Sequence, residues 1–144
     1  MNLRIPIFLA SCIAALTLAV PHAQAQIDPN DPLGLGTKLG VQTMNNSGQL
    51  GSVNLHKRGV KTFVDVSIEG VPHGKVETAS IHRMKDCDGA IDPKATYVLS
   101  DVRNGRSRTL LAVVKDRLLS GNYGVVIASK ENPHHYFGCG HLYK

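Results

Sequence analysis

The feature that most constrains the fold is the alternation of apolar and polar residues in short runs separated by turn residues. In the clearest run, Val64, Val66 and Ile68 alternate with polar residues. A period of two places every second side chain on one face of a strand, so this run predicts a half-buried β-strand. No stretch of helical length has a 3.6-residue period, and only 113–119 fits a single helical turn. The pattern therefore predicts an all-β fold.

Similar strand signals recur along the chain. The expected strands cover 52–56, 64–69, 75–83, 96–100, 107–114, 123–128 and 135–143. Asn104-Gly105 lies between two of them and is the strongest short hairpin signal, because both residues tolerate positive φ. The segment 86–94 carries Asp-Gly and Asp-Pro turn signals and is expected to be a loop. About seven short strands at this spacing predict an antiparallel sandwich or barrel.

Residues 1–25 have the pattern of a secretory signal peptide. Arg4 gives a basic start, positions 5–20 are mostly apolar, and a small-residue A-x-A site ends at Ala25. Cleavage after Ala25 would deliver the protein to the periplasm or the exterior. One alternative is a transmembrane anchor, but the run is shorter than the ~20 residues that span a bilayer. The other is a lipid anchor on Cys12, which ends a lipobox-like sequence but has little apolar sequence before it.

The remainder of the chain divides into a tail and one domain. Residues 26–47 contain several prolines and glycines near their start and little periodicity, which predicts a flexible N-terminal tail. Residues 48–144 contain all the expected strands and are assigned to the β domain. No later segment has enough consecutive apolar residues to cross a bilayer.

Two cysteines, Cys87 and Cys139, remain after removal of the signal peptide. In an oxidising compartment two such cysteines are expected to form a disulfide. The bridge would join positions 52 residues apart and would stabilise the fold by roughly 4 kcal/mol in the chain-entropy model. Metal thiolates and free thiols are the alternatives.

Short motifs around and between these cysteines resemble known families. The segments that resemble copper/zinc superoxide dismutases are Ile81-His82, Asp86-Cys87 and Cys139-Gly140. The segments that more closely resemble a group of small exported bacterial proteins with chordin-type (CHRD) and dismutase-like patterns are Asn104-Gly105-Arg106-Ser107-Arg108-Thr109 and Leu119-x-Gly121-x-Tyr123. The resemblance covers about residues 48–143. It implies an antiparallel Greek-key β-sandwich, in agreement with the strand count, and an intrasubunit disulfide.

Most metal ligands of the dismutase family are missing. The family's H-x-H pair would fall on Ser80 and His82, so one histidine is left. Positions 88–99 contain no histidine, and the late copper ligand would fall at Ala128 or Ser129. A copper centre needs several converging imidazoles, and zinc needs a closed tetrahedral set of ligands. Dismutase activity is therefore not expected.

The predicted bridge could still support a smaller metal site for copper or zinc. The residues of this candidate site are His82, Asp86, His134 and His135. Imidazole and carboxylate ligands suit both metals. Five extended residues span up to ~17 Å, however, so the bridge alone does not make these side chains converge. The alternative interpretation is a polar turn at 132–135 and a hydrogen-bonded strand histidine at His82.

A basic surface patch is predicted at Arg103, Arg106 and Arg108, in a chain of net charge +5. Such a patch could bind acidic glycans, anionic lipid headgroups or nucleic acid. Nucleic acid is not an expected partner outside the cell, and aromatic residues for base stacking are only 5% of the chain. The alternative is a solvated hairpin whose charges protect the sheet edge.

The common enzyme motifs are absent from the sequence, which has no G-x-S-x-G, no H-E-x-x-H and no P-loop. A dispersed Ser-His-Asp triad stays open. The sequence therefore predicts an exported, non-catalytic β-sandwich module with a binding or structural role in the cell envelope or exterior. It would need no cofactor, and its partner would be a protein or a glycan. The alternative is a copper- or zinc-binding periplasmic protein, and a degenerate dismutase-like enzyme is third.

Overall fold

The computed structural model describes residues 36–143, so the predicted signal peptide and Cys12 lie outside the described residues. The strands are β1 (Thr37–Thr43), β2 (Leu50–Arg58), β3 (Lys61–Glu69), β4 (Val76–Met84), β5 (Ile91–Val98), β6 (Val102–Arg103), β7 (Arg106–Leu111), β8 (Tyr123–Ser129) and β9 (Tyr136–His141). A short helix, α1 (Lys115–Ser120), lies between β7 and β8. No helix within 36–143 is long and apolar enough to cross a membrane.

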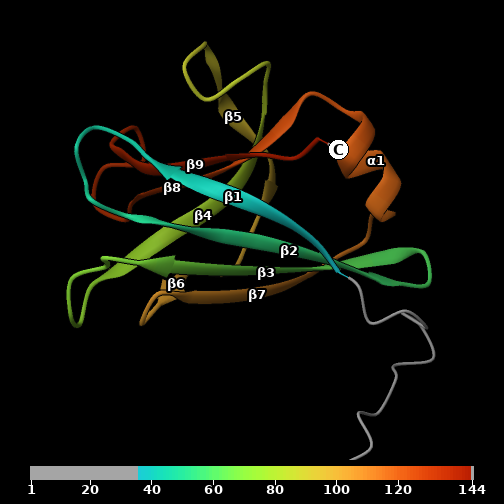
Figure 1. Cartoon of the computed structure of the whole chain (residues 1–144), viewed down its shortest axis with the longest axis horizontal. Coiled ribbons are helices and arrows are strands. Elements are labelled where there is room, and N and C mark those ends of the chain that lie inside the picture. Colours follow the sequence, from blue (N-terminus) through green and yellow to red (C-terminus); the bar gives the residue numbers. More distant parts are fainter. Residues whose placement is uncertain (1–35, 144) are drawn as a thin grey trace, which may run out of the picture.

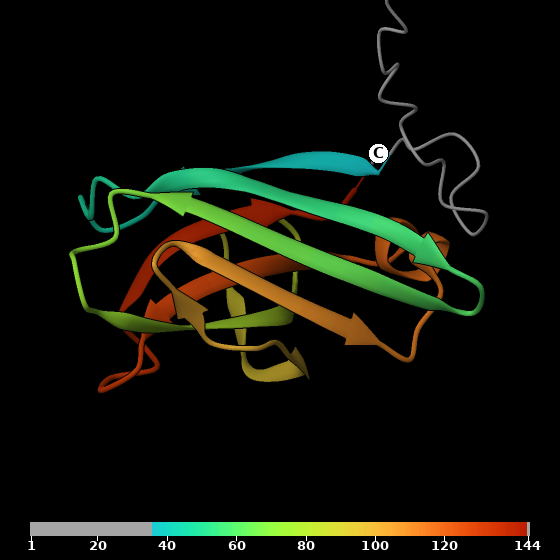
Figure 2. The same cartoon turned by 90° about the horizontal axis from the view of Figure 1, so that it is seen from below.

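The strands form one antiparallel sheet that closes on itself (Figure 1). Their order is β5-β4-β6-β7-β3-β2-β1-β9-β8, and β8 also pairs with β4. The β4–β8 ladder runs from Glu77 opposite Ser129 to Arg83 opposite Tyr123. It closes a barrel of eight strands, with β5 attached to β4 outside the ring. Figure 2 shows β2, β3 and β7 side by side along one side of this barrel.

The all-β prediction is confirmed, but the Greek-key sandwich of about seven strands is wrong in its sheet arrangement and strand number. The physical reason is that turn residues mark where strands end and do not specify which edges pair. The β4–β8 ladder joins two edges that an open sandwich would leave separate. The nine observed strands include β1 and the two-residue β6, neither of which is among the strands expected from the sequence.

The domain begins earlier than predicted. β1 lies within 26–47, the segment expected to be a tail. Its sequence has only a short alternation of Leu39 and Val41 with exposed residues, and of these two apolar residues only Val41 is buried. Pairing with β2 and β9 holds it in the sheet instead. The loop expected at 86–94 is also shorter, because β5 already begins at Ile91.

The clearest alternating run forms the buried face of β3, as predicted. Val64, Val66 and Ile68 have relative exposures of 0%, 2% and 5% and belong to the main core. The predicted helical turn is α1, which places the fully buried Leu118 in the same core. The core therefore fills the inside of the barrel and extends beneath α1.

β8 is buried on both faces, in agreement with its continuous apolar sequence. Val125 and Ile127 lie in the main core, whereas Val126 belongs to a second cluster with Met84 and the two bridge cysteines. The predicted disulfide is confirmed, and the Cα atoms of its cysteines are 5.8 Å apart. The bridge is part of this second cluster and fastens the β4–β5 connection to β9.

The Asn104-Gly105 hairpin is also confirmed, between β6 and β7. Asn104 and Gly105 have φ values of 50° and 73°. The carbonyl oxygen of Gly105 accepts a hydrogen bond of 2.7 Å from the backbone N–H of Ile68. A Cβ atom at Gly105 would lie 2.2 Å from the carbonyl oxygen of Ile68, so the contact with β3 requires glycine.

Candidate functional site

A pocket of about 860 Å³ lies beside the disulfide, and we call it the disulfide pocket. Its lining comes from 39–42 of β1, 85–88 after β4, 121–122 before β8, and Cys139, His141 and Tyr143. Four segments distant in sequence thus meet at one place on the barrel. The volume lies within the range of small-molecule sites in proteins.

The pocket forms where β1 continues beyond a short ladder with β9. The two strands pair only at Gln42 with Cys139 and at Thr43 with Gly138. A Cβ atom at Gly140 would lie 2.6 Å from the carbonyl oxygen of Gly40. Glycine at position 140 therefore allows β1 to pass close to β9 without a regular pairing. The segment 39–42 then forms one wall of the pocket.

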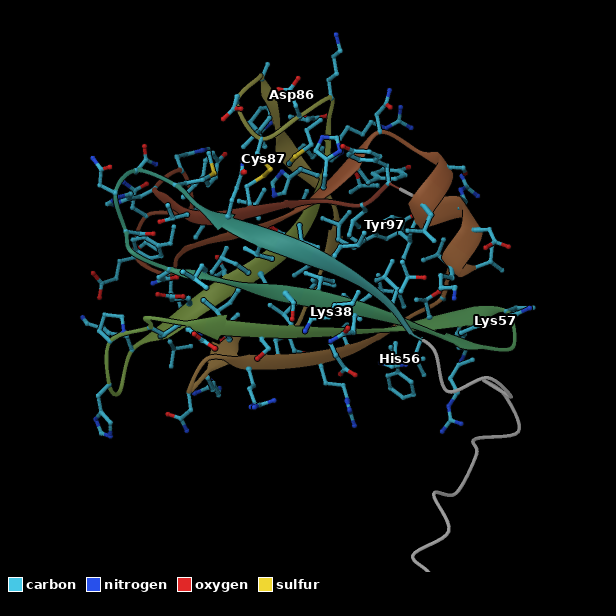
Figure 3. The ribbon with its side chains drawn as sticks, viewed as in Figure 1. Lys38, His56, Lys57, Asp86, Cys87 and Tyr97 are labelled. Atoms are coloured by element: carbon cyan, nitrogen blue, oxygen red, sulfur yellow. A yellow bond between two sulfur atoms is a disulfide. The ribbon has the colours of Figure 1, made fainter. Side chains whose placement is uncertain are left out.

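The disulfide fixes the opposite wall. Cys139 is fully buried and Cys87 is 8% exposed, so the bridge lies at the base of the β4–β5 loop. Figure 3 shows Asp86 beside Cys87 on this loop, away from His56 and Lys57 of β2. The Asp86 side chain is exposed and lies over Gly89, where a Cβ atom would be 2.5 Å from its Oδ1 atom. The loop thus presents charged groups at the rim and sulfur atoms at the floor.

His141 brings hydrogen-bonding capacity into the pocket. Its Nδ1 and Nε2 atoms are both buried, and neither has a hydrogen-bond partner within the described part of the chain. The ring packs edge-on against Tyr143, with ring centroids 4.7 Å apart and an interplanar angle of 84°. Tyr143 is 61% exposed. An imidazole with both nitrogens unpaired can accept and donate hydrogen bonds to a ligand.

The sequence analysis missed His141 and Tyr143 as site residues, although a signal was present. Cys139, His141 and Tyr143 are spaced two residues apart, and this spacing places side chains of a strand on one face. Once Cys139 is paired with Cys87, His141 and Tyr143 are expected beside the bridge.

His82 lies inside the protein and is not part of this pocket. It is 6% exposed on β4. Its Nε2 atom is 2.7 Å from Ser80 Oγ, and its Nδ1 atom is 2.6 Å from the carbonyl oxygen of Asp92. An Nδ1–H donor to the carbonyl and an Nε2 acceptor for the serine hydroxyl satisfy both nitrogens. In this arrangement neither nitrogen is available to a metal.

The structure does not bring the four candidate metal ligands together. His82 is opposite Gly124 at the start of β8, whereas the His135 carbonyl accepts a hydrogen bond from Ser129 at its end. Five residues of strand separate these positions by ~17 Å. His134 and His135 are exposed in the β8–β9 turn, and Asp86 lies on the β4–β5 loop. Within 36–143 no group of three or more His, Cys, Asp or Glu residues could hold a metal ion.

The predicted basic patch is a surface of mixed charge. Arg103 lies 3.6 Å from Asp101. Arg108 donates two hydrogen bonds to Asp65, of 2.5 Å and 3.1 Å, and this contact raises the pKa of Arg108. Arg106 is exposed opposite Arg103. Two of the three guanidinium groups therefore face carboxylates, which lowers the positive potential available to an anionic partner.

Comparisons of the chain with protein families, with curated proteins and with solved structures found no match. The resemblance to dismutase-like and CHRD-like domains therefore stays a prediction, carried by the short motifs around the two cysteines and by those at 104–109 and 119–123.

Proposed function

We propose that this protein is an exported, non-catalytic binding module and that the disulfide pocket binds a glycan. The observation that carries the proposal is His141, which lines a pocket of about 860 Å³ and whose two buried imidazole nitrogens have no hydrogen-bond partner among residues 36–143. Buried polar groups are normally hydrogen-bonded, so a ligand with hydroxyl groups would complete this site. A second reason is the variety of polar groups around it.

The polar lining suits hydroxyl groups better than a ligand of one charge. Asp86 supplies a carboxylate and Lys85 an ammonium group, while Gln42 and Asn122 supply amides that both donate and accept. A sugar hydroxyl also donates and accepts, so it can match any of these partners. The lining carries one ammonium group, that of Lys85, and two carboxylates, those of Asp86 and Asp88, so a strongly charged ligand of either sign would meet a like charge.

The apolar part of the pocket suits the C–H face of a sugar ring. The Tyr143 ring is largely exposed, and the half-buried Leu39 contributes apolar surface on the β1 side. Aromatic side chains combine a flat apolar face with a polar tip and are common in binding sites. Of the two partner classes that the sequence predicts, this chemistry favours a glycan over a protein.

Export is part of the same proposal. The Cys87–Cys139 bridge supports a location in the periplasm or outside the cell, because disulfides persist in oxidising compartments. The position of the bridge also supports the proposed likeness to dismutase-like and CHRD-like domains. Export with cleavage after Ala25 predicts that the mature chain begins with Gln26, which N-terminal sequencing of the secreted protein would test.

The binding proposal is tested by calorimetric titration with chitotriose, cellotriose, maltotriose and mannotriose. At least one trisaccharide is expected to bind, and His141→Ala and Tyr143→Ala should each weaken it about tenfold or more, because each removes a direct ligand contact. His135→Ala is the matched control, since His135 is exposed outside the pocket. Failure of all four sugars to bind, or equal affinity in all variants, would contradict the proposal.

The same purified protein also tests the alternative prediction of a metal protein. Copper or zinc near one atom per chain, lost in His134→Ala or His135→Ala, would favour that alternative over glycan binding. Metal binding at His82 would require its hydrogen bonds to Ser80 and Asp92 to break.

A further inference from the structure

Glu77 is a carboxyl group buried inside one end of the barrel. It occupies an inward position of β4, in alternation with the buried Ala79 and Ile81, and is 3% exposed. Its neighbours across the sheet are Val102 of β6 and Ser129 of β8. An ionised carboxylate at such a position loses hydration and requires compensation from other groups.

Gln49 provides only part of that compensation. This residue is also 3% exposed, and its Nε2 atom donates a hydrogen bond of 2.5 Å to Glu77 Oε1. Two buried oxygens, Glu77 Oε2 and Gln49 Oε1, have no hydrogen-bond partner among residues 36–143. Native proteins leave very few buried polar atoms unpaired. These two acceptors therefore point to a ligand that donates hydrogen bonds.

Both residues line a pocket of about 260 Å³, which we call the mouth pocket. Its wall also includes Lys75, Lys130 and Glu131, and it shares no residue with the disulfide pocket. The mouth of a small barrel is a common place for a ligand site. The volume fits a small head group with a few attached carbons.

The charges around the mouth pocket favour a cation. The Lys130 ammonium group is 2.5 Å from Asp101 Oδ2, and Arg103 lies 3.6 Å from the same oxygen, so a carboxylate outside the pocket offsets part of the positive charge there. In the pocket wall, the carboxyl groups of Glu77 and Glu131 accompany one other ammonium group, that of the exposed Lys75. Burial also raises the pKa of Glu77, against a smaller lowering by the hydrogen bond from Gln49. A bound cation would stabilise the ionised carboxylate.

We propose that the mouth pocket binds the N–H-bearing head group of a small organic cation, an ammonium or a guanidinium, through Glu77 Oε2 and Gln49 Oε1. Such head groups supply several donors and a positive charge together. This site is separate from the proposed glycan site, so either proposal can fail without the other.

The test is a titration of ¹⁵N-labelled protein with methylguanidinium and with n-butylammonium, in which the chemical shifts of the backbone amides are monitored by NMR. Both probes are expected to shift the amides of Gln49, Glu77 and Ser129 with saturation. Tetramethylammonium, which has no N–H donor, and urea, which has no charge, should bind at least tenfold more weakly. Glu77→Gln should weaken methylguanidinium binding tenfold or more, while the matched control Glu69→Gln, which changes an exposed carboxylate outside the pocket, should change it less than threefold.

A second variant, Gln49→Met, keeps the side-chain volume and removes one acceptor, so it should weaken binding even if Glu77→Gln folds poorly. The proposal is overturned if neither cation gives saturable shifts at the mouth, which is the result expected if water alone satisfies these oxygens. Equal binding of tetramethylammonium and methylguanidinium would overturn it as well, as would unchanged affinity in both Glu77→Gln and Gln49→Met.

Discussion

The disulfide is expected to supply a large part of the stability of this fold. The bridge joins residues 52 positions apart, and the chain-entropy model gives about 4 kcal/mol for a loop of this length. Small domains have total stabilities of about 5–15 kcal/mol. Reduction of the bridge should therefore lower the free energy of unfolding by about 4 kcal/mol and the melting temperature by about 15–30 °C.

The double variant Cys87→Ala/Cys139→Ala should lose slightly more than the reduced parent. Cys139 is fully buried and Cys87 nearly so, in a cluster with Met84 and Val126. Removing the two sulfur atoms leaves small voids that add about 1 kcal/mol to the loss, whereas reduction leaves the sulfur atoms in place. The difference between the two samples therefore separates packing from chain constraint.

Two contributions, that of the chain constraint and that of the packing, can be measured by urea unfolding monitored by circular dichroism. The three samples are the oxidised parent, the reduced parent and the double variant. The expected order of stability is oxidised parent, reduced parent, double variant. A loss below about 1 kcal/mol on reduction would refute the loop-constraint argument. Equal stability of the reduced parent and the double variant would refute the packing term alone.

Three further perturbations test the fold and the buried carboxyl group. Gly105→Ala should lower the free energy of unfolding in urea by about 2 kcal/mol or more, because the φ of Gly105 is 73° and the new Cβ would lie 2.2 Å from a backbone oxygen. The control Gly74→Ala, at a φ of 75° with no atom near the new Cβ, should lower it by only about 1 kcal/mol. Equal losses in the two variants would contradict the contact at Gly105. Leu55→Ala, at a fully buried position, should cost about 2–5 kcal/mol, against about 0.5 kcal/mol or less for the 55% exposed Leu50→Ala. Burial raises the pKa of Glu77, so the folded protein binds the carboxyl proton more tightly than the unfolded chain does. The parent should therefore lose stability relative to Glu77→Gln as the pH rises from about 4.5 through the pKa of Glu77 in the folded protein. A pH-independent difference between these two proteins would show that Glu77 does not titrate in this way.

The sequence predicted individual strands well because their signals are local. The alternation at Val64, Val66 and Ile68 and the positive-φ turn at Asn104-Gly105 depend on a few neighbouring residues, and both are present in the structure. The disulfide could be predicted because only two cysteines remain after the expected signal peptide. β1 was missed because its alternation involves only Leu39 and Val41 and follows a segment rich in proline and glycine, and because the ladders with β2 and β9 that hold it in place are not visible in its own sequence.

Sheet closure and the two pockets depend on contacts between distant residues. Nothing in β4 or β8 alone indicates that Glu77 pairs with Ser129 and that the ladder closes the barrel. The histidines near the cysteines suggested a metal site by proximity in sequence. Proximity in sequence does not reveal that both ring nitrogens of His82 are hydrogen-bonded within the protein, or that His82 and His135 lie near opposite ends of β8. His141 lies closest in sequence to Cys139 and lines the pocket that the bridge creates.

The most direct test of the proposed function is to map where a glycan binds. Amide chemical shifts of ¹⁵N-labelled, oxidised protein would be followed during titration with whichever trisaccharide binds best in the calorimetric series. Binding in the disulfide pocket predicts saturable shifts confined to 39–42, 85–88, 121–122 and the segment around His141 and Tyr143. Shifts centred on other residues, or none with any of the sugars, would contradict the assignment of this pocket as a glycan site.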